Sequence, residues 1–493
     1  MNILMIIAVF LPMVTGAVLP FVRLGSRKNK LALTGAVLAA EAVIAVILAA
    51  GTSNEFTLFS MTEILTVSLK IDNLSRLFLI VFSFGFLLAG IFAFKYTEHE
   101  EAEGSFKEEM FYAFYLLTLG AMIGISMAHN LVAMYLFFEL VTILSMPLVL
   151  FEKTEQSINA ALKYLFYSVG GAFMALFCIF TLAQYTTTLE FVKGGTLDTA
   201  LVEGHTGLVL AAVFAGVVGF GAKAGMYPLH GWLPTAHPVA PAPASAVLSG
   251  LITKAGVLSI IRVIYFVAGP EFLAGTWVQM VWIGLSLITV FMGSMMAYRE
   301  KVLKKRLAYS SVSQISYVLF GLFLMNEIAL KGALMQIVFH ATVKVGLFLF
   351  AGSIIFNTHC HNVDELTGFG KSMPVTFICF TMGSLSLIGI PPFAGFVSKW
   401  YLAKGALASG IAVYSYLGPV VLLLSALLTA GYLLPVTIHG FFPGKDFKAE
   451  KNYSEGGMLM KAPLMILAAL ALLMGVCGGF LSPFFDAVVS AVI

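Results

Sequence analysis

Several lysine residues lie inside long apolar segments of this 493-residue chain, where an ammonium group is costly to bury. Two of them, Lys223 and Lys399, stand beside stretches rich in proline and glycine, one in each half of the sequence. Intramembrane lysines are functional-site candidates by default, because hydrocarbon offers their charge no solvation. Two such sites at interrupted helices suggest a path for ions.

The first interrupted stretch runs from Gly219 to Gly256 and holds five prolines, the first of which is Pro228. Proline removes a backbone donor and its ring clashes with the preceding turn, so the helix that holds Lys223 must break here. The freed backbone groups can be satisfied only by protein or by water in a cavity. We therefore expect water close to Lys223.

A second long apolar segment, from Ser386 to Gly405, is interrupted by Pro391 and Pro392, and Lys399 follows within two helical turns. Paired broken helices in corresponding positions of two halves are typical of transporters built from inverted repeats. For each break alone, a kink accommodated by neighbouring helices is the structural alternative. The coincidence of both breaks with lysines weighs against it.

Glu139 lies in the middle of another apolar segment and has no counter-charge nearby in the sequence. A carboxyl group there must pair across helices, carry a proton or face water. Lys223 is the partner that we expect. Lys254 lies in the helix after the first break, and Arg262 follows eight residues later on roughly the same helical face.

The remaining polar residues of the apolar segments differ in how strongly they indicate a functional site. His340 and Lys344 are one turn apart, so both face the same way, and inward is the cheaper direction. Glu41 has no polar motif around it, which favours structural pairing or a peripheral role. Lys163 lies near a helix end, where snorkelling of its amine explains it as well as a relay does. The His-Cys-His tract at 359–361 lacks further ligands, so we expect loop residues rather than a metal site.

The composition sets the class, since 60% of the residues are hydrophobic and only 11% are charged. We predict one all-α membrane domain over residues 1–493 with about fourteen transmembrane helices. The first is expected to be a membrane helix rather than a cleaved leader, because it is long enough to span and basic residues follow it. The expected helices cover residues 3–22, 31–50, 73–94, 110–128, 130–150, 158–183, 206–226, 244–265, 277–298, 306–324, 329–356, 374–404, 412–440 and 462–485.

Charge placement predicts the topology of these helices. Roughly seventeen lysines and arginines fall in the loops on one side and roughly five on the other, which places both termini outside the cytoplasm. The mostly acidic segment 95–109 is expected to be a solvated cytoplasmic connector, with a docking surface as the alternative. We expect small buried apolar residues rather than disulfide, zinc or cluster ligands at the four widely spaced cysteines, Cys178, Cys360, Cys379 and Cys477.

Several ordered motifs resemble the proton-conducting antiporter-like subunits shared by respiratory complex I, Mrp-type cation/proton antiporters and energy-converting hydrogenases. The motifs are IDNLSRLF at 71–78, the run from Lys223 through WLPTAH and SAVLSG to Lys254, LAYSSVSQ at 307–314, His340, and PPFAGFVSKW at 391–400. The resemblance implies fourteen helices with two inverted five-helix repeats, in which helices seven and twelve are broken. The repeats would cover residues 110–265 (helices four to eight) and 277–440 (helices nine to thirteen).

The resemblance also assigns roles to single residues. Lysine at position 399, and a chain that ends soon after the fourteenth helix, bring the resemblance closest to the D-type proteins of Mrp antiporters. Val302 stands where an acidic residue often precedes the LAYSSVSQ motif, so the subfamily stays open. The helix breaks are assigned to Pro228, Pro391 and Pro392. The implied proton relay consists of Glu139, Lys223, Lys254, His340, Lys344 and Lys399.

The expected mechanism follows from electrostatics. A buried lysine without a counter-charge tends to lose its proton, and a carboxylate within about 4–6 Å favours the ammonium form. Movement of Glu139 relative to Lys223 would therefore load or release a proton, which would travel through water wires towards Lys399. His340 suits a middle position, because histidine takes and gives protons near neutral pH.

No nucleotide loop, flavin fingerprint or cluster-binding cysteine pattern occurs in the sequence, so we expect no cofactor and no metal. Whether the chain is part of an enzyme then depends on its partners. We expect other membrane subunits, with hydrophilic iron–sulfur subunits if the assembly is a redox pump. The transported ion is H+, Na+ stays open, and nucleic acid is not expected.

Two rival functions remain at this stage. A stand-alone secondary transporter would bind an organic solute between the half-helix ends, but it would need a varied polar pocket rather than titratable groups strung across helices. A purely structural scaffold would not explain six cationic side chains inside the bilayer, each of which costs about 2.5–3.5 kcal/mol on insertion scales. Proton relay is therefore favoured.

Overall fold

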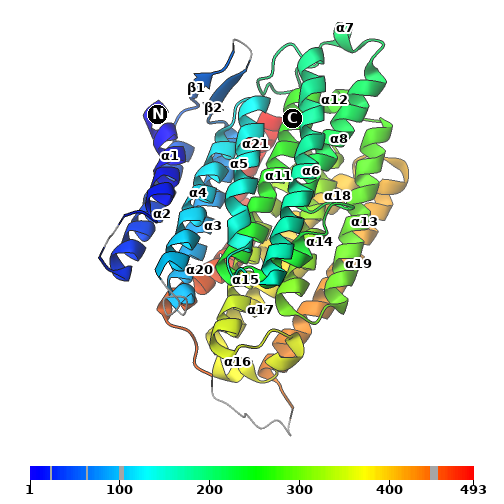
Figure 1. Ribbon diagram of the computed structural model, residues 1–493. Helices are drawn as coiled ribbons and strands as arrows, with labels where there is room; N and C mark the ends of the chain where they lie inside the picture. The colour runs from blue at the N-terminus through cyan, green and yellow to red at the C-terminus, as the bar shows by residue number, and fades with distance from the viewer. Residues whose placement is uncertain (23–24, 63–64, 99–104, 445–452) are drawn as a thin grey trace.

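Long helices run side by side through the molecule, from the N-terminal pair at one edge to α13 and α19 at the other (Figure 1). The computed structural model describes residues 1–22, 25–62, 65–98, 105–444 and 453–493. Its elements are α1 (Asn2–Val18), α2 (Arg27–Ala50), β1 (Glu55–Ser60), β2 (Thr66–Lys70), α3 (Asn73–Tyr96), α4 (Ser105–Met127), α5 (Leu131–Val149), α6 (Glu155–Tyr185), α7 (Thr199–Val202), α8 (Thr206–Ala224), α9 (Leu233–Val239), α10 (Ala242–Val247), η2 (Leu248–Ile252), α11 (Thr253–Ile261), η3 (Arg262–Ala268), α12 (Pro270–Leu273), α13 (Trp277–Arg299), α14 (Leu303–Phe323), α15 (Glu327–Thr358), η4 (Val363–Leu366), α16 (Phe369–Ser372), α17 (Pro374–Ile388), α18 (Ala394–Leu407), α19 (Ala412–Phe441), α20 (Met458–Val476) and α21 (Gly478–Val492).

The fourteen predicted segments are all helical. Within the described residues, eleven helices are long and apolar enough to cross a membrane. The other three predicted segments correspond to α1, to the serine-rich α14, and to α17 with α18, which are shorter or more polar. The all-α class is therefore confirmed, and the two breaks occur in the predicted segments.

The structure differs from the predicted elements in three places. Residues 55–60 and 66–70 pair as the antiparallel strands β1 and β2, where no element was expected. The first helix ends at Val18 rather than at 22, because Pro20 has no N–H group to continue the hydrogen bonds of the helix. The single helix predicted at 462–485 is wrong, since α20 and α21 are separate helices that meet at Cys477.

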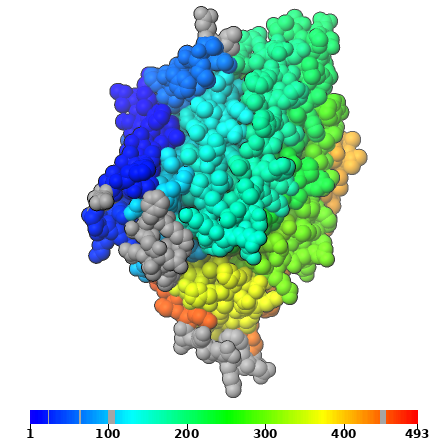
Figure 2. All heavy atoms as spheres, viewed as in Figure 1, coloured from blue at the N-terminus to red at the C-terminus, as the bar shows by residue number. Residues whose placement is uncertain are grey.

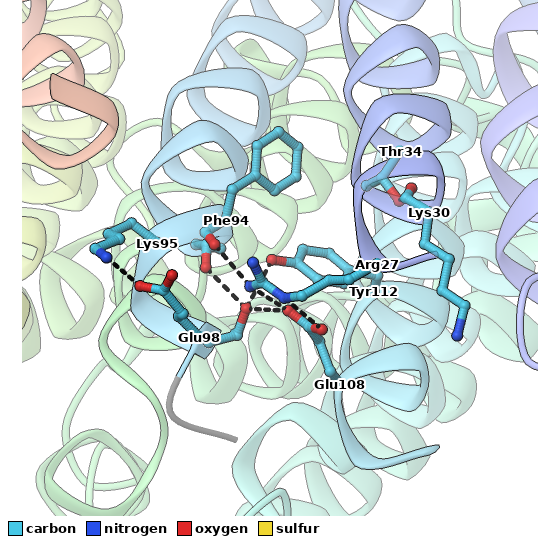
Figure 3. A network of polar contacts seen from close by, with 10 residues as sticks. Arg27, Lys30, Thr34, Phe94, Lys95, Glu98, Glu108 and Tyr112 are labelled. Atoms are coloured by element: carbon cyan, nitrogen blue, oxygen red, sulfur yellow. Dashed lines mark hydrogen bonds and ion pairs between the residues drawn. The ribbon is translucent and has the colours of Figure 1, made fainter. Parts of the chain in front are cut away.

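The predicted solvated connector at 95–109 is only partly a connector. Residues 99–104 lie outside the described residues, but helix α4 begins at Ser105, and Glu108 is only 6% exposed. The Arg27 guanidinium of α2 donates to both oxygens of Glu108 at 2.7 and 3.1 Å and to the Phe94 carbonyl at 2.9 Å, while Thr97 donates to the same carboxylate at 2.6 Å (Figure 3). This network ties α2 to α3 and α4 at one end of the bundle.

The innermost segment is the run α10 to η3 (Ala242–Ala268). A stretch of this segment long enough to cross a membrane is completely buried inside the molecule. The outer helices instead expose large apolar side chains, for example Phe166 of α6 and Leu427 of α19, as expected for a lipid-facing surface. In the space-filling view of Figure 2, the N-terminal helices form one edge of the molecule and the middle of the chain forms the opposite edge.

The four cysteines are all free, as the sequence predicted. Cys178 and Cys379 are buried, which confirms that part of the expectation. Cys360 is partly exposed and Cys477 is exposed, so the expected burial is wrong for these two. Cys477 is the junction between α20 and α21, where the chain turns at the surface.

Candidate functional site: a line of buried amines between two broken helices

The first broken helix consists of α8 and α9, with residues 225–232 between them. Helix α8 ends at Ala224 because Gly225 adopts the left-handed conformation at a φ of 87°. The Ala222 carbonyl freed by the break accepts a hydrogen bond from the Trp232 ring at 2.8 Å. Lys223 therefore lies in the last turn of α8, where the helix dipole favours a cation.

Lys223 is 1% exposed and contacts α5. Its ammonium donates to the Thr142 hydroxyl at 2.5 Å and to the Phe138 carbonyl at 3.2 Å, and lies 4.4 Å from the centre of the Phe138 ring. The charge of Glu139 acts on it electrostatically. Within the described residues, however, no direct ion pair joins the two, and one Glu139 carboxyl oxygen is buried without a hydrogen-bond partner. The expected partnership is thus electrostatic rather than a direct contact.

Lys254 and His340 are in direct contact at the centre of the molecule. Both are 1% exposed, and the Lys254 amine lies 2.8 Å from Nδ1 of the His340 ring. Two non-standard helical segments, η2 and η3, flank α11, and the Lys254 amine also donates back to the Ser249 carbonyl of η2 at 2.9 Å. Wide helical turns of this kind are frequent at functional sites. With Lys254 as the ammonium, Nδ1 accepts and the His340 proton resides on Nε2.

Lys344 follows His340 by one turn on α15 and is completely buried. Its ammonium donates to the Leu307 carbonyl of α14 at 2.9 Å. The predicted inward direction of both side chains is therefore found. The charges of Lys254 and Lys344 both act on His340, so three protonatable groups share one electrostatic neighbourhood.

The second broken helix consists of α17 and α18, with residues 389–393 between them. Gly389 ends α17 in the left-handed conformation at a φ of 93°. Lys399 of α18 reaches back across the break, and its ammonium donates to the carbonyls of Leu387 at 2.5 Å and Ile388 at 2.8 Å. These are the last carbonyls of α17, so in both broken helices a lysine lies at the C-terminal end of the first half-helix, where a cation is stabilised.

A group of hydrogen-bonded polar side chains, which we call the corridor, includes residues close in sequence to His340 and to Lys399. Gln336 lies one turn before His340 on α15, and its amide donates to the Gln314 side chain of α14 at 3.0 Å. Ser398, the residue before Lys399, donates to the other end of Gln336 at 2.5 Å. Gln314 Nε2 and His340 Nε2 are buried without partners, so each offers a position for water.

The family follows from comparison with known proteins. A family model described as "NADH:quinone oxidoreductase/Mrp antiporter, TM" matches residues 128–429, which include all six predicted relay residues. The chain belongs to this family. The N-type protein of the NADH-quinone oxidoreductase of Desulforudis audaxviator is 33% identical over 83% of this chain and 81% of its own length. The D-type protein of the Na(+)/H(+) antiporter of Bacillus subtilis is 29% identical over 85% of this chain and 82% of its own.

A solved structure shows that the family fold extends over the whole chain. A protein of the Mrp complex from Dietzia sp. DQ12-45-1b matches with a TM-score of 0.83, at 22% identity, over 100% of this chain and 98% of its own. This protein is therefore a multi-pass, antiporter-type membrane subunit of the family, whose structural neighbours are multisubunit membrane complexes. The predicted resemblance is confirmed at the level of the family.

Sequence reasoning missed several polar residues of the antiporter-type site. Thr142, Gln314, Gln336 and Ser398 carry no charge, and such residues are common in helices, so only their spacing from the charged groups could have indicated them. His237 of α9 was quoted in a motif without a role. It is completely buried, both ring nitrogens lack partners, and the charges of lysines in three helices act on it.

The other polar residues of the apolar segments lie outside this antiporter site. Arg262 pairs with Asp72 at 2.6 Å, a contact between η3 and the start of α3. Lys163 is exposed and donates to the Thr235 hydroxyl at 3.0 Å. Glu41 is completely buried, and neither carboxyl oxygen has a hydrogen-bond partner, so the structural pairing favoured from sequence is not found in the described residues. The tract at 359–361 follows the end of α15.

Proposed function

We propose that this antiporter-type subunit conducts protons along Glu139, Lys223, Lys254, His340, Lys344 and Lys399. The observation that carries the proposal is the 2.8 Å contact between the amine of Lys254 and the imidazole of His340, two groups with almost no exposure. Two titratable nitrogens at hydrogen-bond distance can exchange a proton directly. A scaffold would have no use for them there, since burying such groups is costly.

The central step is a transfer between lysine and histidine. The Lys254 ammonium gives a proton to Nδ1 of His340, which leaves a neutral amine and an imidazolium. The imidazolium then releases its Nε2 proton towards the corridor of Gln336 and Gln314, where water would complete the hydrogen-bond chain. Loss of the proton from the far nitrogen leaves the histidine neutral in its other tautomer, with a proton on Nδ1, so the ring must exchange tautomers before Nδ1 can accept again.

The loading step involves Glu139 and Lys223. The Lys223 ammonium is held by one hydroxyl and one carbonyl, both of which are uncharged groups. The negative charge of the Glu139 carboxylate also attracts the ammonium, and this attraction weakens as the distance between the two groups grows. Approach of Glu139 favours the ammonium form, and its withdrawal favours release of the proton towards Lys254. Water near the break between α8 and α9 would link the two lysines.

The same proposal includes the arrangement of the chain in its assembly. We place both termini outside the cytoplasm, from the distribution of lysines and arginines in the loops. We assign residues 110–265 and 277–440 to two inverted repeats, which the similar placement of lysines at both breaks supports. The assembly is an Mrp-type Na+/H+ antiporter or a redox pump related to complex I or to energy-converting hydrogenases. In a redox pump, hydrophilic iron–sulfur subunits would supply the driving force.

A stand-alone carrier of an organic solute is the alternative function. The described residues include a cavity of about 880 Å³, large enough for a small molecule. It is lined by Gln279, Asn326 and neighbouring residues of loops and helix ends, and by none of the six relay residues. The titratable groups therefore do not line this cavity, which favours a proton path.

The test uses the whole purified complex in proteoliposomes with a pH-sensitive dye. We expect Lys223→Ala and Glu139→Ala to lower proton uptake at least tenfold, because each removes a group from the loading step. Lys331→Ala is the matched control, since Lys331 is another buried lysine but pairs with Asp486 at 2.5 Å, away from the relay. Wild-type rates for both relay variants in an assembled complex would show that the relay assignment is wrong.

A further inference from the structure

Three side chains that could ligate a metal meet at the end of the molecule that carries the β hairpin and both termini (Figure 1). Glu55 comes from β1, His129 from the turn between α4 and α5, and Glu190 from the loop after α6. Their ligand atoms all lie within 4.8 Å of one another. Because the three positions are far apart in the sequence, no spacing pattern indicates them, and no metal was expected.

His129 provides the fixed part of this cluster. The residue is only 4% exposed, and its backbone is held by hydrogen bonds from its N–H to the Ser68 carbonyl and from the Phe191 N–H to its own carbonyl. Its Nε2 lies 3.3 Å from a Glu55 oxygen and 3.8 Å from a Glu190 oxygen. Both separations exceed the usual N–H···O distance of about 2.9–3.0 Å, so Nε2 lies between two carboxylates at distances longer than those of a typical hydrogen bond.

The separations fit a metal better than they fit hydrogen bonds. Ligands about 2.0–2.1 Å from a tetrahedral Zn²⁺ are roughly 3.3 Å apart, close to the spacing of His129 and Glu55. The Glu190 oxygen lies 3.8 Å from Nε2, but the two glutamate side chains are 46% and 50% exposed, so they can move closer to a shared ion, and solvent can supply the fourth ligand. One imidazole and two carboxylates suit Zn²⁺ and similar transition metals, whereas Ca²⁺ and Mg²⁺ prefer all-oxygen sites.

We propose that Glu55, His129 and Glu190 bind a divalent transition-metal ion of the Zn²⁺ class. The bound ion would link the β1–β2 hairpin to the loops before α5 and after α6. The site is independent of the proton relay, because none of its three residues belongs to it. Binding would stabilise the folded hairpin in proportion to metal occupancy.

Lys70 is the competing cation at this site. It is the cross-strand partner of Glu55, and its ammonium lies 3.4 Å from the Glu55 oxygen that faces His129. Its side chain is 34% exposed and can turn into solvent when a metal binds. Removing this positive charge should therefore tighten metal binding, whereas a simple ion-pair cluster would only lose a contact.

The experiment measures Zn²⁺ binding to the full chain in its purified complex after removal of metal, by equilibrium dialysis and elemental analysis, with Co²⁺ absorption as a second readout. We expect one ion per wild-type chain, at least tenfold weaker binding for His129→Ala, Glu55→Gln and Glu190→Gln, and about tenfold tighter binding for Lys70→Met. The exposed Glu203 provides the matched control Glu203→Gln, which should bind like the wild type.

The three site variants differ in their risk to folding. His129 is buried, but the two glutamates are half exposed, so Glu55→Gln and Glu190→Gln keep the test informative if His129→Ala does not fold. Equal Zn²⁺ binding by the wild type and the two glutamine variants, or no saturable binding by the wild type, would overturn the proposal. In that case the cluster is an ordinary group of surface ion pairs.

Discussion

The corridor between His340 and Lys399 can be tested through Gln336. This residue is 2% exposed, its amide nitrogen donates to Gln314, and its amide oxygen accepts from Ser398. The change Gln336→Leu keeps a similar volume but removes both hydrogen bonds. If protons travel through this corridor, the variant should slow transport without removing any titratable group.

The expected size follows from the two lost contacts. Each buried hydrogen bond contributes about 1 kcal/mol net, so the corridor loses about 2 kcal/mol. If the same interactions orient the proton-carrying chain, the barrier rises by a similar amount, which corresponds to a roughly 30-fold lower rate. The free energy of unfolding should also fall by about 2 kcal/mol, whether or not the corridor conducts.

The matched control separates conduction from stability. Gln279 is 3% exposed and also makes two hydrogen bonds, to the Gly275 N–H at 2.8 Å and to the Phe323 carbonyl at 3.0 Å, but it lies outside the corridor. In proteoliposomes that contain the assembled complex, Gln279→Leu should pump at the wild-type rate despite a similar loss of thermal stability. Wild-type pumping by Gln336→Leu, or an equal loss in both variants, would refute the reasoning.

Two further predictions concern polar groups outside the relay. Glu41→Leu should raise the free energy of unfolding by about 1 kcal/mol, because it replaces a buried carboxyl group that has no hydrogen-bond partner; a lower melting temperature in detergent would contradict this. Arg262→Gln should cost about 3 kcal/mol at pH 7, because it leaves Asp72 without its ion pair. Burial alone would raise the pKa of Asp72, but the charge and hydrogen bonds of Arg262 hold it below its usual value, so this stabilisation exists above about pH 4 and is lost on acidification. Melting curves of the wild type and the variant should converge only as the pH falls through the lowered pKa of Asp72, and a constant difference would show that the ion pair is not the cause.

The sequence predicted the helices well because membrane spans need long apolar runs, and such runs are visible without any tertiary information. It also located both breaks, since proline and glycine act locally. The failures have equally physical reasons. Strands β1 and β2 have only six and five residues, so their periodicity is a weak signal, and the end of α20 at Val476 lies inside an apolar run that continues into α21.

The candidate site was predicted in part. Charged residues inside apolar runs are conspicuous, so Lys254, His340 and Lys344 could be named, and the structure brings these three together. The neutral corridor residue Gln336 could not, because an amide in a helix has no signal until its partners on two other helices are known. The distance between two side chains is equally invisible in a sequence, which could name Lys223 as the partner of Glu139 but could not say how closely the two groups approach.

The two ends of the proposed relay hold their lysines in different ways. Lys399 is held by the Leu387 and Ile388 carbonyls, which are fixed at the end of α17. Lys223 is also held by a carbonyl and a hydroxyl, but in addition it feels Glu139, a charge on a separate helix whose distance changes if α5 and α8 shift. At an effective dielectric constant of about 20, moving two unit charges from about 4 to 8 Å changes their interaction by about 2 kcal/mol, or roughly 30-fold in protonation equilibrium. We infer that the first half contains the adjustable step and the second half a fixed acceptor, so loss of Glu139 should abolish control of loading while leaving the Lys399 end intact.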